Sequence, residues 1–390
     1  MSIILNPEFL LPKKGVDYSK WAVIACDQFT SQREYWESVK EYVGDAPSAL
    51  NMIFPEAYLS EDNEARIHSI NENMRDMLDS DFFDVYKGFV LVERTLANGH
   101  KRLGLMIAVD LEAYEYTPDT HAPIRATERT VVERLPIRVD IRRNAVLELP
   151  HIMLLMNDPT KSIIEELYEH RGEMWQIYDF DLNMNGGHIT GYFFNDDELI
   201  ERIEHMSHNE LLFAVGDGNH SLATAKECWN EKKENGLAKH SPHARYAMCE
   251  LVNLYDDSLE FAPIHRIIKG QCVEFIREMQ DTLQGDASIV AILDGVEYNI
   301  NVDSNASDAI KDIQDFIDAR VSGTDIDYIH GDEYVREVAS REGAIAIMMP
   351  TIEKEGLFDY VERRGVLPRK AFSMGEAEDK RYYVEARRIN

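Results

Sequence analysis

Residues 211–229 read LLFAVGDGNHSLATAKECW, and this segment does most to decide the fold of the 390-residue chain. Its first part, residues 211–215, is an apolar run of the length of a buried strand. Residues 222–229 are rich in helix formers and carry apolar side chains at helical spacing. Because Gly216 and Gly218 permit a tight turn between the two parts, the segment predicts a strand, a turn and a helix in succession.

The turn at residues 216–221 is a candidate binding site. The first N–H groups of a helix have no partner within the helix, and this end of the helix carries partial positive charge. An anion such as phosphate is therefore stabilised there. Asp217 and His220 stand in the same turn, placed to move a proton or a phosphoryl group. The candidate ligand-binding residues of the turn are Gly216, Gly218, Asn219 and Ser221.

A purely structural turn is the competing interpretation. Asp and Asn favour turns for local reasons, and Ser221 belongs to the residue types that cap helices. A dinucleotide fingerprint, in contrast, is not expected, because Ser221 occupies the place of its third glycine. The acidic residue of such a site is also missing from a strand end, since Glu250 lies inside an apolar run.

Asp27 is a second candidate for ligand binding. It follows a predicted strand at residues 21–25 and precedes a predicted helix that begins near Gln32 and ends at Gly44. It therefore lies at the carboxyl end of a strand, where α/β folds tend to hold their ligands. The alternative is that this segment only caps the helix, through Thr30 or Ser31.

Residues 124–144 are dense in Arg and Glu. Arg125 and Glu128 would be needed if the segment lines an anion site. The alternative is a solvated helical face with ion pairs one turn apart, each contributing only tenths of a kcal/mol. Thr130 and Glu133 have the spacing of a capping box, which is a further structural interpretation.

The charge of the chain argues against nucleic acid as a partner. The sequence holds 71 acidic and 41 basic residues, a formal net charge of −30. Proteins bind duplex DNA largely by placing Lys and Arg against its phosphates, and this chain has no surplus of them. A few local arginines and a helix terminus still suffice for a small anion.

The sequence carries no sign of a membrane span, a leader or a metal cluster. No apolar window has the length needed to cross a bilayer, and residues 1–12 lack the pattern of a signal peptide. The 4 cysteines have no C-x-x-C spacing, and the 13 histidines form no H-E-x-x-H pair. We therefore expect a soluble cytoplasmic protein that contacts no membrane.

The turn GDGNHS resembles the Asp-Gly-His-His-Arg signature of the bacterial and archaeal family catalogued as domain of unknown function 1015. Asn219 replaces the first His of that signature, and Ser221 replaces its Arg. Glu128 and Thr130 match a His-Glu-x-Thr element of the family, and His265 and Arg266 match its Pro-Thr-His-Arg segment. Further similar segments, in the same order, are residues 328–331, the apolar run ending at Pro350, and residues 365–370. The resemblance thus covers nearly the whole chain.

The signature of that family is in turn similar to the phosphate-binding turn of the ParB, sulfiredoxin and free serine kinase group. The resemblance implies a mixed α/β (α+β) fold, with a ParB/sulfiredoxin-like phosphate-binding core and an additional C-terminal α/β region. It also implies phosphoryl transfer to or from a small hydroxylated metabolite, with serine or phosphoserine as the leading candidate. A phosphatase is the nearest enzymatic alternative. A regulatory protein that binds a nucleotide or phosphorylated metabolite without catalysis is the other, since the chain lacks the bidentate Arg of the signature.

In the enzyme hypothesis, the turn holds the transferred phosphate while Arg266 and Arg125 supply positive charge. Glu128 or Asp217 accepts the hydroxyl proton, and His220 donates a proton to the leaving group. Magnesium between Asp217 and Glu128, with a nucleotide or pyrophosphate, is compatible with this site because hard cations prefer carboxylate oxygens. If one site exists, these groups, together with Asp27 and His265, should converge on the turn.

The remaining pattern predicts two regions. Residues 1–266 form a main α/β domain that carries the turn, and residues 267–390 form a C-terminal α/β region packed on it. The main domain is expected to contain a hairpin around Asn98-Gly99, an amphipathic helix over residues 61–80, and strands over residues 149–156 and 246–254. The C-terminal region is expected to contain helices over residues 271–284 and 306–320, a hairpin at Asp294-Gly295 and a strand over residues 344–349.

Overall fold

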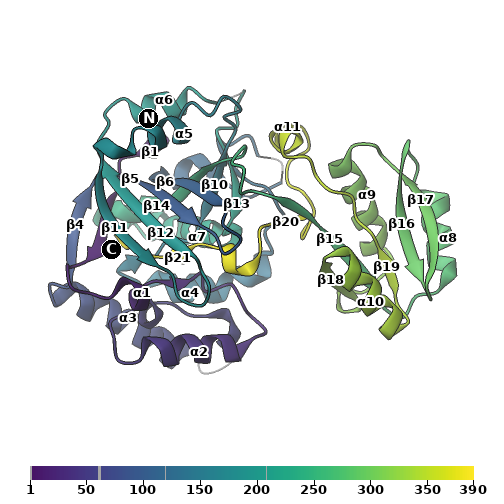
Figure 1. Cartoon of the computed structure of the whole chain (residues 1–390), viewed down its shortest axis with the longest axis horizontal. Coiled ribbons are helices and arrows are strands. Elements are labelled where there is room, and N and C mark those ends of the chain that lie inside the picture. The colour runs from purple at the N-terminus through teal and green to yellow at the C-terminus, as the bar shows by residue number, and fades with distance from the viewer. Residues whose placement is uncertain (1, 60–62, 119, 208) are drawn as a thin grey trace. The chain divides into compact units, whose positions relative to one another are not determined.

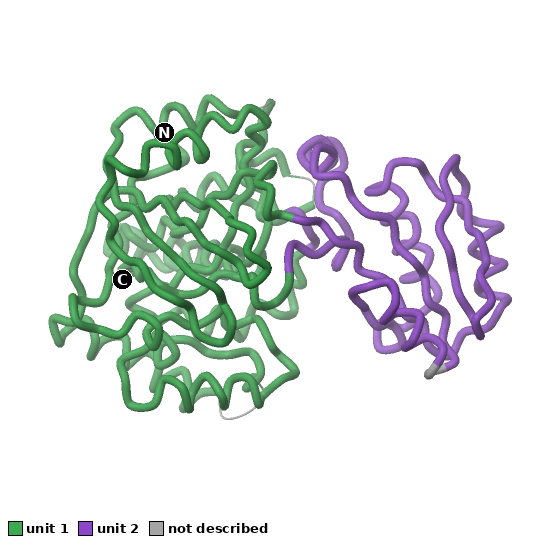
Figure 2. Tube along the Cα trace, viewed as in Figure 1, with its two compact units in different colours: residues 1–126, 130–259, 376–390 green, residues 127–129, 260–375 purple. Residues whose placement is uncertain are grey.

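The computed structural model describes residues 2–59, 63–118, 120–207 and 209–390. It divides into two compact units, shown in Figure 2. Unit 1 comprises residues 1–126, 130–259 and 376–390, and unit 2 comprises residues 127–129 and 260–375. Each unit contains a sheet and helices, which confirms the predicted mixed α/β class. Among the described residues, no helix combines the length and the apolar character needed to span a bilayer.

Unit 1 is built on a large mixed sheet (Figure 1). In spatial order its strands are β11 (Trp175–Asp181), β12 (His188–Phe194), β5 (Phe89–Thr95), β6 (Lys101–Asp110), β14 (Tyr246–Asn253), β10 (Met153–Met156), β13 (Phe213–Asp217), β8 (Ile124–Ala126) and β7 (Tyr114–Glu115), with β1 (Ile4–Leu5) paired to β6. The hairpin predicted around Asn98-Gly99 is β5–β6. Strand β14 runs parallel to β10, whereas β13 runs antiparallel to it.

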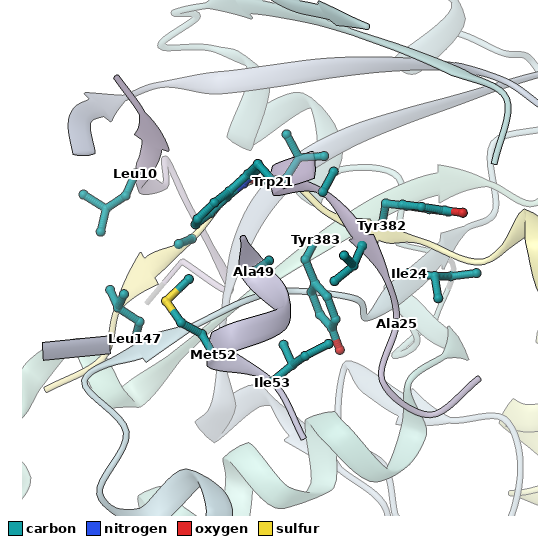
Figure 3. Packing of buried hydrophobic residues seen from close by; sticks show 14 of the residues in the cluster. Leu10, Trp21, Ile24, Ala25, Ala49, Met52, Ile53, Leu147, Tyr382 and Tyr383 are labelled. Carbon is teal, nitrogen blue, oxygen red and sulfur yellow. The ribbon is translucent and has the colours of Figure 1, made fainter. Parts of the chain in front are cut away.

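Side chains alternate between two cores on the faces of this sheet, as the two-residue period of a strand requires. Leu105 and Ile107 of β6 point into one core, and Met106 between them points into the other. The first core receives α5 (Ile164–Glu169), α6 (Leu199–Glu204) and α7 (Asn219–Glu234). The second is covered by α1 (Tyr18–Trp21), α2 (Arg33–Val43), α3 (Asn63–Asp79), β2 (Glu8–Pro12), β3 (Val23–Ile24) and β4 (Phe83–Lys87). Figure 3 shows part of this second core around Trp21 and Tyr383.

Most local predictions for unit 1 agree with these elements. The helix expected from Gln32 to Gly44 is α2, and the one expected over residues 61–80 is α3, although residues 61 and 62 lie outside the described part of the chain. Neither Thr30 nor Ser31 caps α2, because its N-cap is Gln32 and makes no side-chain capping bond. The strand expected over residues 149–156 begins only at Met153, and the shorter β9 (Leu147–Glu148) precedes it.

The last residues of the chain, 376–390, pair with strands of unit 1. Strand β21 (Tyr382–Tyr383) pairs with β3, and β22 (Arg387–Arg388) pairs with β9. Between them, Ala386 exchanges backbone hydrogen bonds with Leu10 of β2. The C-terminal segment therefore joins three short strands of unit 1.

Buried ion pairs attach this segment to the large sheet. Arg381 is 3% exposed and is paired with Glu250 of β14 and with Glu385. The Tyr178 hydroxyl donates to Glu385 Oε1 over 2.6 Å, and Arg387 Nη1 lies 2.7 Å from Glu148 Oε1. Burial by itself would raise the pKa of Glu250, but Arg381 and the neighbouring arginines outweigh it and lower that pKa.

Unit 2 contains the second sheet. In spatial order its strands are β17 (Val296–Val302), β16 (Ala287–Leu293), β19 (Ile345–Ile347), β15 (Phe261–Ile268) and β18 (Ile326–His330), with β20 (Phe372–Met374) paired to the start of β15. The helices of this unit are α8 (Val273–Thr282), α9 (Ala306–Asp318), α10 (Asp332–Glu342) and α11 (Leu357–Arg364). The predicted helices over residues 271–284 and 306–320, the hairpin at Asp294-Gly295 and the strand over residues 344–349 are all present as α8, α9, β16–β17 and β19.

The division of the chain differs from the boundary predicted between residues 266 and 267. Strand β15 begins at Phe261 and pairs entirely within unit 2, so the boundary falls before it. Residues 376–390 belong to unit 1, because their strand pairing and ion pairs are with that unit. Residues 127–129 belong to unit 2, because Leu367 donates to Thr127 O and accepts from Arg129 N.

Removal of the Arg381 guanidinium should destabilise unit 1. Arg381→Ala leaves the carboxylates of Glu250 and Glu385 buried without their shared cation, which costs about 3–5 kcal/mol. Urea unfolding followed by circular dichroism measures the change. Arg388→Ala is the matched control, because Arg388 is exposed in the same segment and its loss should change stability by less than about 0.5 kcal/mol. Equal stability of the two variants would contradict the anchoring role.

The same ion pairs should make unit 1 sensitive to acid. The pKa values of Glu148 and Glu250 are lowered in the folded protein. Their contribution to stability is therefore complete above the unfolded pKa of about 4.3 and is lost as the pH falls through the lower folded values. The free energy of unfolding should decrease below about pH 4.3, and less steeply in Arg381→Ala. A wild-type profile no steeper than that of the variant would argue against this origin.

Candidate functional site

The pairing of β13 with β10 decides what surrounds the turn. Because the two strands are antiparallel, the end of β13 lies beside the start of β10, with Asp217 opposite Met153. The chain then turns through Gly218, whose φ of +76° is in the left-handed region, and α7 begins at Asn219. An added Cβ at Gly218 would lie 3.0 Å from Ile152 Cα, so both the backbone conformation and the close approach favour glycine. The residues just before β10 thus become neighbours of the turn.

His151, one of these residues, is the centre of a hydrogen-bonded cluster. Its Nε2 lies 2.8 Å from Ser221 Oγ and 3.7 Å from Asp27 Oδ2, and its Nδ1 lies 2.9 Å from the Tyr383 hydroxyl. The Tyr383 hydroxyl oxygen accepts the Cys26 N–H over 3.1 Å and has a second lone pair, so it can also accept an N–H from Nδ1. In the tautomer with its proton on Nδ1, the neutral ring presents the lone pair of Nε2 to the Ser221 hydroxyl.

The Ser221 side chain belongs to this cluster and does not cap the helix. Ser221 does not cap α7, because the N-cap is Gly218 and makes no side-chain bond. The hydroxyl of Ser221 is directed at His151 instead. Asp27 reaches the same ring, so two residues predicted from separate segments meet through His151.

Asp217 forms an ion pair at the turn. Its Oδ2 lies 3.3 Å from Lys380 Nζ, and its Oδ1 accepts from the N–H of Gly218 over 3.0 Å. Burial alone would raise the pKa of Asp217, but the charges of Lys380 and His151 and the Gly218 N–H lower it. A carboxylate with a lowered pKa is a weak proton acceptor, so this environment does not favour Asp217 as the general base. Lys380 places a cation beside a turn whose own signature Arg is missing.

Two buried arginines hold the backbone that carries Lys380. Arg94 of β5 donates to the carbonyl oxygens of Glu378 and Lys380, the first over 2.7 Å. Arg102 of β6 donates to the carbonyl of Asp379 over 2.8 Å. These contacts come from two strands of the large sheet, so the position of Lys380 is fixed by the core rather than by a surface loop.

A cavity of about 140 Å³ adjoins this cluster. Its polar lining consists of Cys26, Glu56, Arg138, Arg142, Glu148, His151, Ser221, Thr224 and Tyr383. The remaining wall is largely apolar, and in Figure 3 the Tyr383 ring extends from its strand toward Ile53 of that wall. Engineered cavities of about 150 Å³ hold a molecule of the size of benzene. The space therefore suits a small metabolite.

An ion pair borders this cavity. Arg138 of α4 (Leu135–Arg143) is paired with Glu56, and both side chains are largely buried. Burial raises the pKa of Glu56, and the charge of Arg138 only partly opposes this. Burial likewise raises the pKa of the Cys26 thiol, so this cysteine is not a thiolate.

His220 and Arg125 have other partners than the predicted ones. His220 Nε2 accepts from the N–H of Val131 over 3.3 Å, so a proton donated by this ring would have to come from Nδ1. Arg125 is buried, its Nε donates to Ala122 O over 2.7 Å, and it lies 3.9 Å from Glu210. The prediction that Arg125 supplies charge at the turn stays a prediction.

Two side-chain oxygens near the turn are buried without a hydrogen-bond partner in the described structure. Asn219 Oδ1 is one of them, at the first position of α7. Thr130 Oγ1 is the other, so the predicted capping box with Glu133 does not form.

Glu128, the predicted base, lies in unit 2. Its Oε2 accepts from Lys370 N and its Oε1 from Ala371 N, each over 3.3 Å. Burial raises the pKa of Glu128, opposed in part by the charge of Lys370 and these two N–H groups. The carboxylate therefore fixes the backbone after Leu367, and its convergence with the turn stays a prediction.

His265 and Arg266 lie on β15, also in unit 2. His265 Nδ1 accepts from Met349 N over 3.0 Å, which leaves Nε2 to donate to Asp332 at 2.9 Å. Arg266 is fully buried and donates through Nε to Gln314 Oε1 over 2.9 Å. Both contribute to the packing of β15, and their predicted meeting with the turn is likewise untested. Among the described residues, no three His, Cys, Asp or Glu side chains are grouped as ligands of a metal ion.

Sequence reasoning missed three members of the unit 1 cluster. Tyr383 and Lys380 come from the last residues of the chain, whose pairing with β3 has no local signature. His151 follows Pro150 at the start of a strand, and only the antiparallel pairing of β10 with β13 brings it to Ser221. His151 stands next to the apolar run of a predicted strand, and this position could have marked it as a candidate. The sequence does not show which residues it contacts.

The chain belongs to the family described as "Protein of unknown function (DUF1015)", whose model matches residues 10–322. This confirms the resemblance read from the motifs. No curated protein matches the chain.

Several solved structures are similar to part of the chain. A free serine kinase mutant in complex with AMP has a TM-score of 0.42 and 10% sequence identity, covering 71% of this chain and 90% of its own. A conserved hypothetical protein from Pyrococcus furiosus has a TM-score of 0.36 and 11% identity, covering 69% and 90%. SbnI from Staphylococcus aureus, truncated at its C-terminus, has a TM-score of 0.39 and 9% identity, covering 69% and 82%. Similarity at this level carries no argument about function.

Replacement of Gly218 should cost more than replacement of a glycine with the same backbone strain and no neighbours. In Gly218→Ala the methyl group meets Ile152, whereas Gly99, with φ +85°, has nothing within 4 Å. We expect Gly99→Ala to lose about 1 kcal/mol from left-handed strain alone, and Gly218→Ala about 2–3 kcal/mol. Equilibrium unfolding in urea measures both. Equal losses would show that the approach of the turn to β10 is not tight.

Proposed function

We propose that unit 1 is an enzyme of phosphoryl transfer to or from a small hydroxylated metabolite. The reacting groups meet at the turn of residues 216–221, and the core around it is of the ParB/sulfiredoxin-like, phosphate-binding kind that the signature implies. The observation that carries the proposal is the position of His151, with Nε2 at 2.8 Å from Ser221 Oγ and the ring lining the cavity. Proton transfer needs a titratable group within hydrogen-bond reach of the reacting oxygen, and this ring borders the space in which a hydroxyl of the metabolite would bind.

The N-terminus of α7 and Lys380 supply the positive potential for the phosphate. The helix begins at the turn itself, so its first N–H groups and its dipole are directed there. Lys380 adds a full charge at the same place, paired in part with Asp217. Electrostatic stabilisation of this kind is usually the largest contribution to phosphoryl transfer. Together they replace the Arg that the signature has where this chain has Ser221.

His151 is proposed to exchange the proton. When a hydroxyl of the metabolite attacks phosphorus, a new P–O bond forms, the bond to the donor oxygen breaks, and the hydroxyl proton passes to Nε2. In the reverse direction, Nε2 returns that proton to the leaving oxygen. The hydrogen bond to Tyr383 and the nearby Asp27 orient the ring. His220, whose Nε2 accepts a backbone N–H, is the weaker candidate for this role.

The cavity sets the size and the polarity of the metabolite. Its volume of about 140 Å³ fits a molecule of a few heavy atoms, and its polar wall offers both a carboxylate and a guanidinium, those of Glu56 and Arg138. A small amino acid with a hydroxyl group, such as serine or its phosphate ester, has matching charges. Hydrolysis of the ester is the same reaction with water as acceptor. The departures at Asn219 and Ser221 favour the second candidate, a regulatory protein that binds such a metabolite without turnover.

His151→Gln should abolish phosphoryl transfer while the fold remains intact. Gln keeps a hydrogen-bonding side chain but cannot exchange a proton, so the rate should fall by about 10²–10⁴-fold. The assay offers serine with nucleotide or pyrophosphate donors, and phosphoserine with water, after a thermal-shift screen of these compounds. A ligand at about 100 times its Kd should add about 2.7 kcal/mol of stability. The melting temperature of the variant should change by only a few degrees.

Two further variants sharpen this test. His240→Gln, at an exposed histidine of unit 1, should leave the rate unchanged, and His220→Ala should affect it less than His151→Gln. A rate within about tenfold of wild type in His151→Gln would refute the assigned role of this ring. A wild-type protein that binds phosphoserine but turns over no substrate would establish the regulatory candidate instead.

A further inference from the structure

Arg266 is a fully buried cation with unused hydrogen-bonding capacity. Its Nε donates to Gln314 Oε1 over 2.9 Å and its Nη1 donates to Ile264 O, but its Nη2 has no partner within the described residues. A buried charged donor left without an acceptor costs more than a neutral one. The packing of β15 explains the first two contacts and leaves the third group unexplained.

Tyr328 presents a second unused donor beside it. This residue of β18 is the register partner of Arg266 on β15, and the Arg266 guanidinium lies 4.8 Å from the centre of its ring. The hydroxyl oxygen of Tyr328 is buried and has no hydrogen-bond partner within the described residues. A buried phenol usually has a hydrogen-bond partner. Arg266 and Tyr328, which are neighbours, therefore each have a buried donor without an acceptor within the described residues.

Arg369 brings a second guanidinium to the same ring. Its Cζ lies 5.6 Å from the centre of the Tyr328 ring, and its side chain is exposed. Burial lowers the pKa of Arg266 to about 10, and the charge of Arg369 adds to this effect, so the two cations lie close enough to repel each other. Like charges held together without an acceptor between them are typical of a site built for an anion.

Neither carboxylate that influences the pKa of Arg266 fills this need, because Asp318 accepts from Gln314 Nε2 over 2.8 Å and Glu128 is held elsewhere. Glu128 is close enough to influence the pKa of Arg266, but no ion pair joins them. Its two oxygens accept the N–H groups of Lys370 and Ala371 instead. Glu128 thereby fixes the backbone next to Arg369. Arg266 Nη2 and the Tyr328 hydroxyl are left without an acceptor within the described residues.

We infer that Arg266, Tyr328 and Arg369 form an anion site in unit 2 that binds the phosphate group of a small phosphorylated molecule. A tetrahedral phosphate offers acceptors in several directions, which suits donors from two guanidinium groups and one phenol better than a planar carboxylate does. This site is built entirely from residues of unit 2. It does not depend on the proposed chemistry at the turn of unit 1.

Titration calorimetry of the full chain with inorganic pyrophosphate tests the inference. Tyr328→Phe keeps the ring against both arginines and removes only the hydroxyl, so it should fold normally and raise the Kd by about 10-fold, as expected for a hydrogen bond to a charged group. Arg369→Ala should weaken binding by a similar factor. Arg363→Ala removes an equally exposed cation from α11 and should leave the Kd within about twofold. Unchanged affinity in Tyr328→Phe and Arg369→Ala, or no binding by the wild type, would overturn the proposal.

Variants of unit 1 separate this site from the proposed function. Ser221→Ala and His151→Gln should leave pyrophosphate affinity at unit 2 unchanged, even where they abolish turnover. Loss of pyrophosphate binding in those variants, with normal binding in Tyr328→Phe, would place the anion at the turn and refute a site in unit 2. Malonate serves as a dicarboxylate probe of similar size. Binding of malonate at least as tight as that of pyrophosphate would refute the assignment to phosphate.

Discussion

The buried ion pairs of Arg381 are the constraint on which the architecture of unit 1 depends. Two carboxylates, those of Glu250 on the central strand β14 and of Glu385, share one guanidinium inside the protein. Even the adjacent strand is adapted to this, because a Cβ at Gly104 of β6 would collide with the Glu250 side chain. Removing charges from water is expensive, so such a group persists only where every member is paired. The buried ion pairs therefore hold the C-terminal segment on the sheet more strongly than the backbone pairing of its short strands does.

The geometry of the candidate site depends on the ion pairs of Arg381. The segment fixed by Arg381 carries Lys380 on one side and Tyr383 on the other, and these two residues contact Asp217 and His151. The turn itself supplies its backbone and the side chains of Asp217 and Ser221 to these contacts. Lys380 is the cation beside the turn, and Tyr383 orients His151. Both lie more than 150 positions from the turn along the chain. Stability and the proposed chemistry thus rest on the same short stretch of sequence.

Local pattern predicted the elements well, and long-range pairing explains what it missed. The strand, turn and helix around Gly218, the hairpin β5–β6 and the helices of unit 2 all follow from periodicity and turn residues. The same reasoning could not predict that β10 and β13 are antiparallel, because a strand buried on both faces is a continuous apolar run whichever way its neighbour points. This single pairing decides that His151, and not the nearer His220, lies against Ser221.

Electrostatic context decides what the charged residues predicted from the sequence can do. Arg125 and Arg266 were natural candidates for an anion from the sequence, yet Arg125 is held by Ala122 and Glu210, and Arg266 is buried in unit 2. The net charge of −30 says nothing of the local sign inside a fold. What decides a role is whether burial leaves a charged group paired or unpaired. By that criterion the paired Arg381 is structural, whereas the unpaired Nη2 of Arg266 points to a ligand.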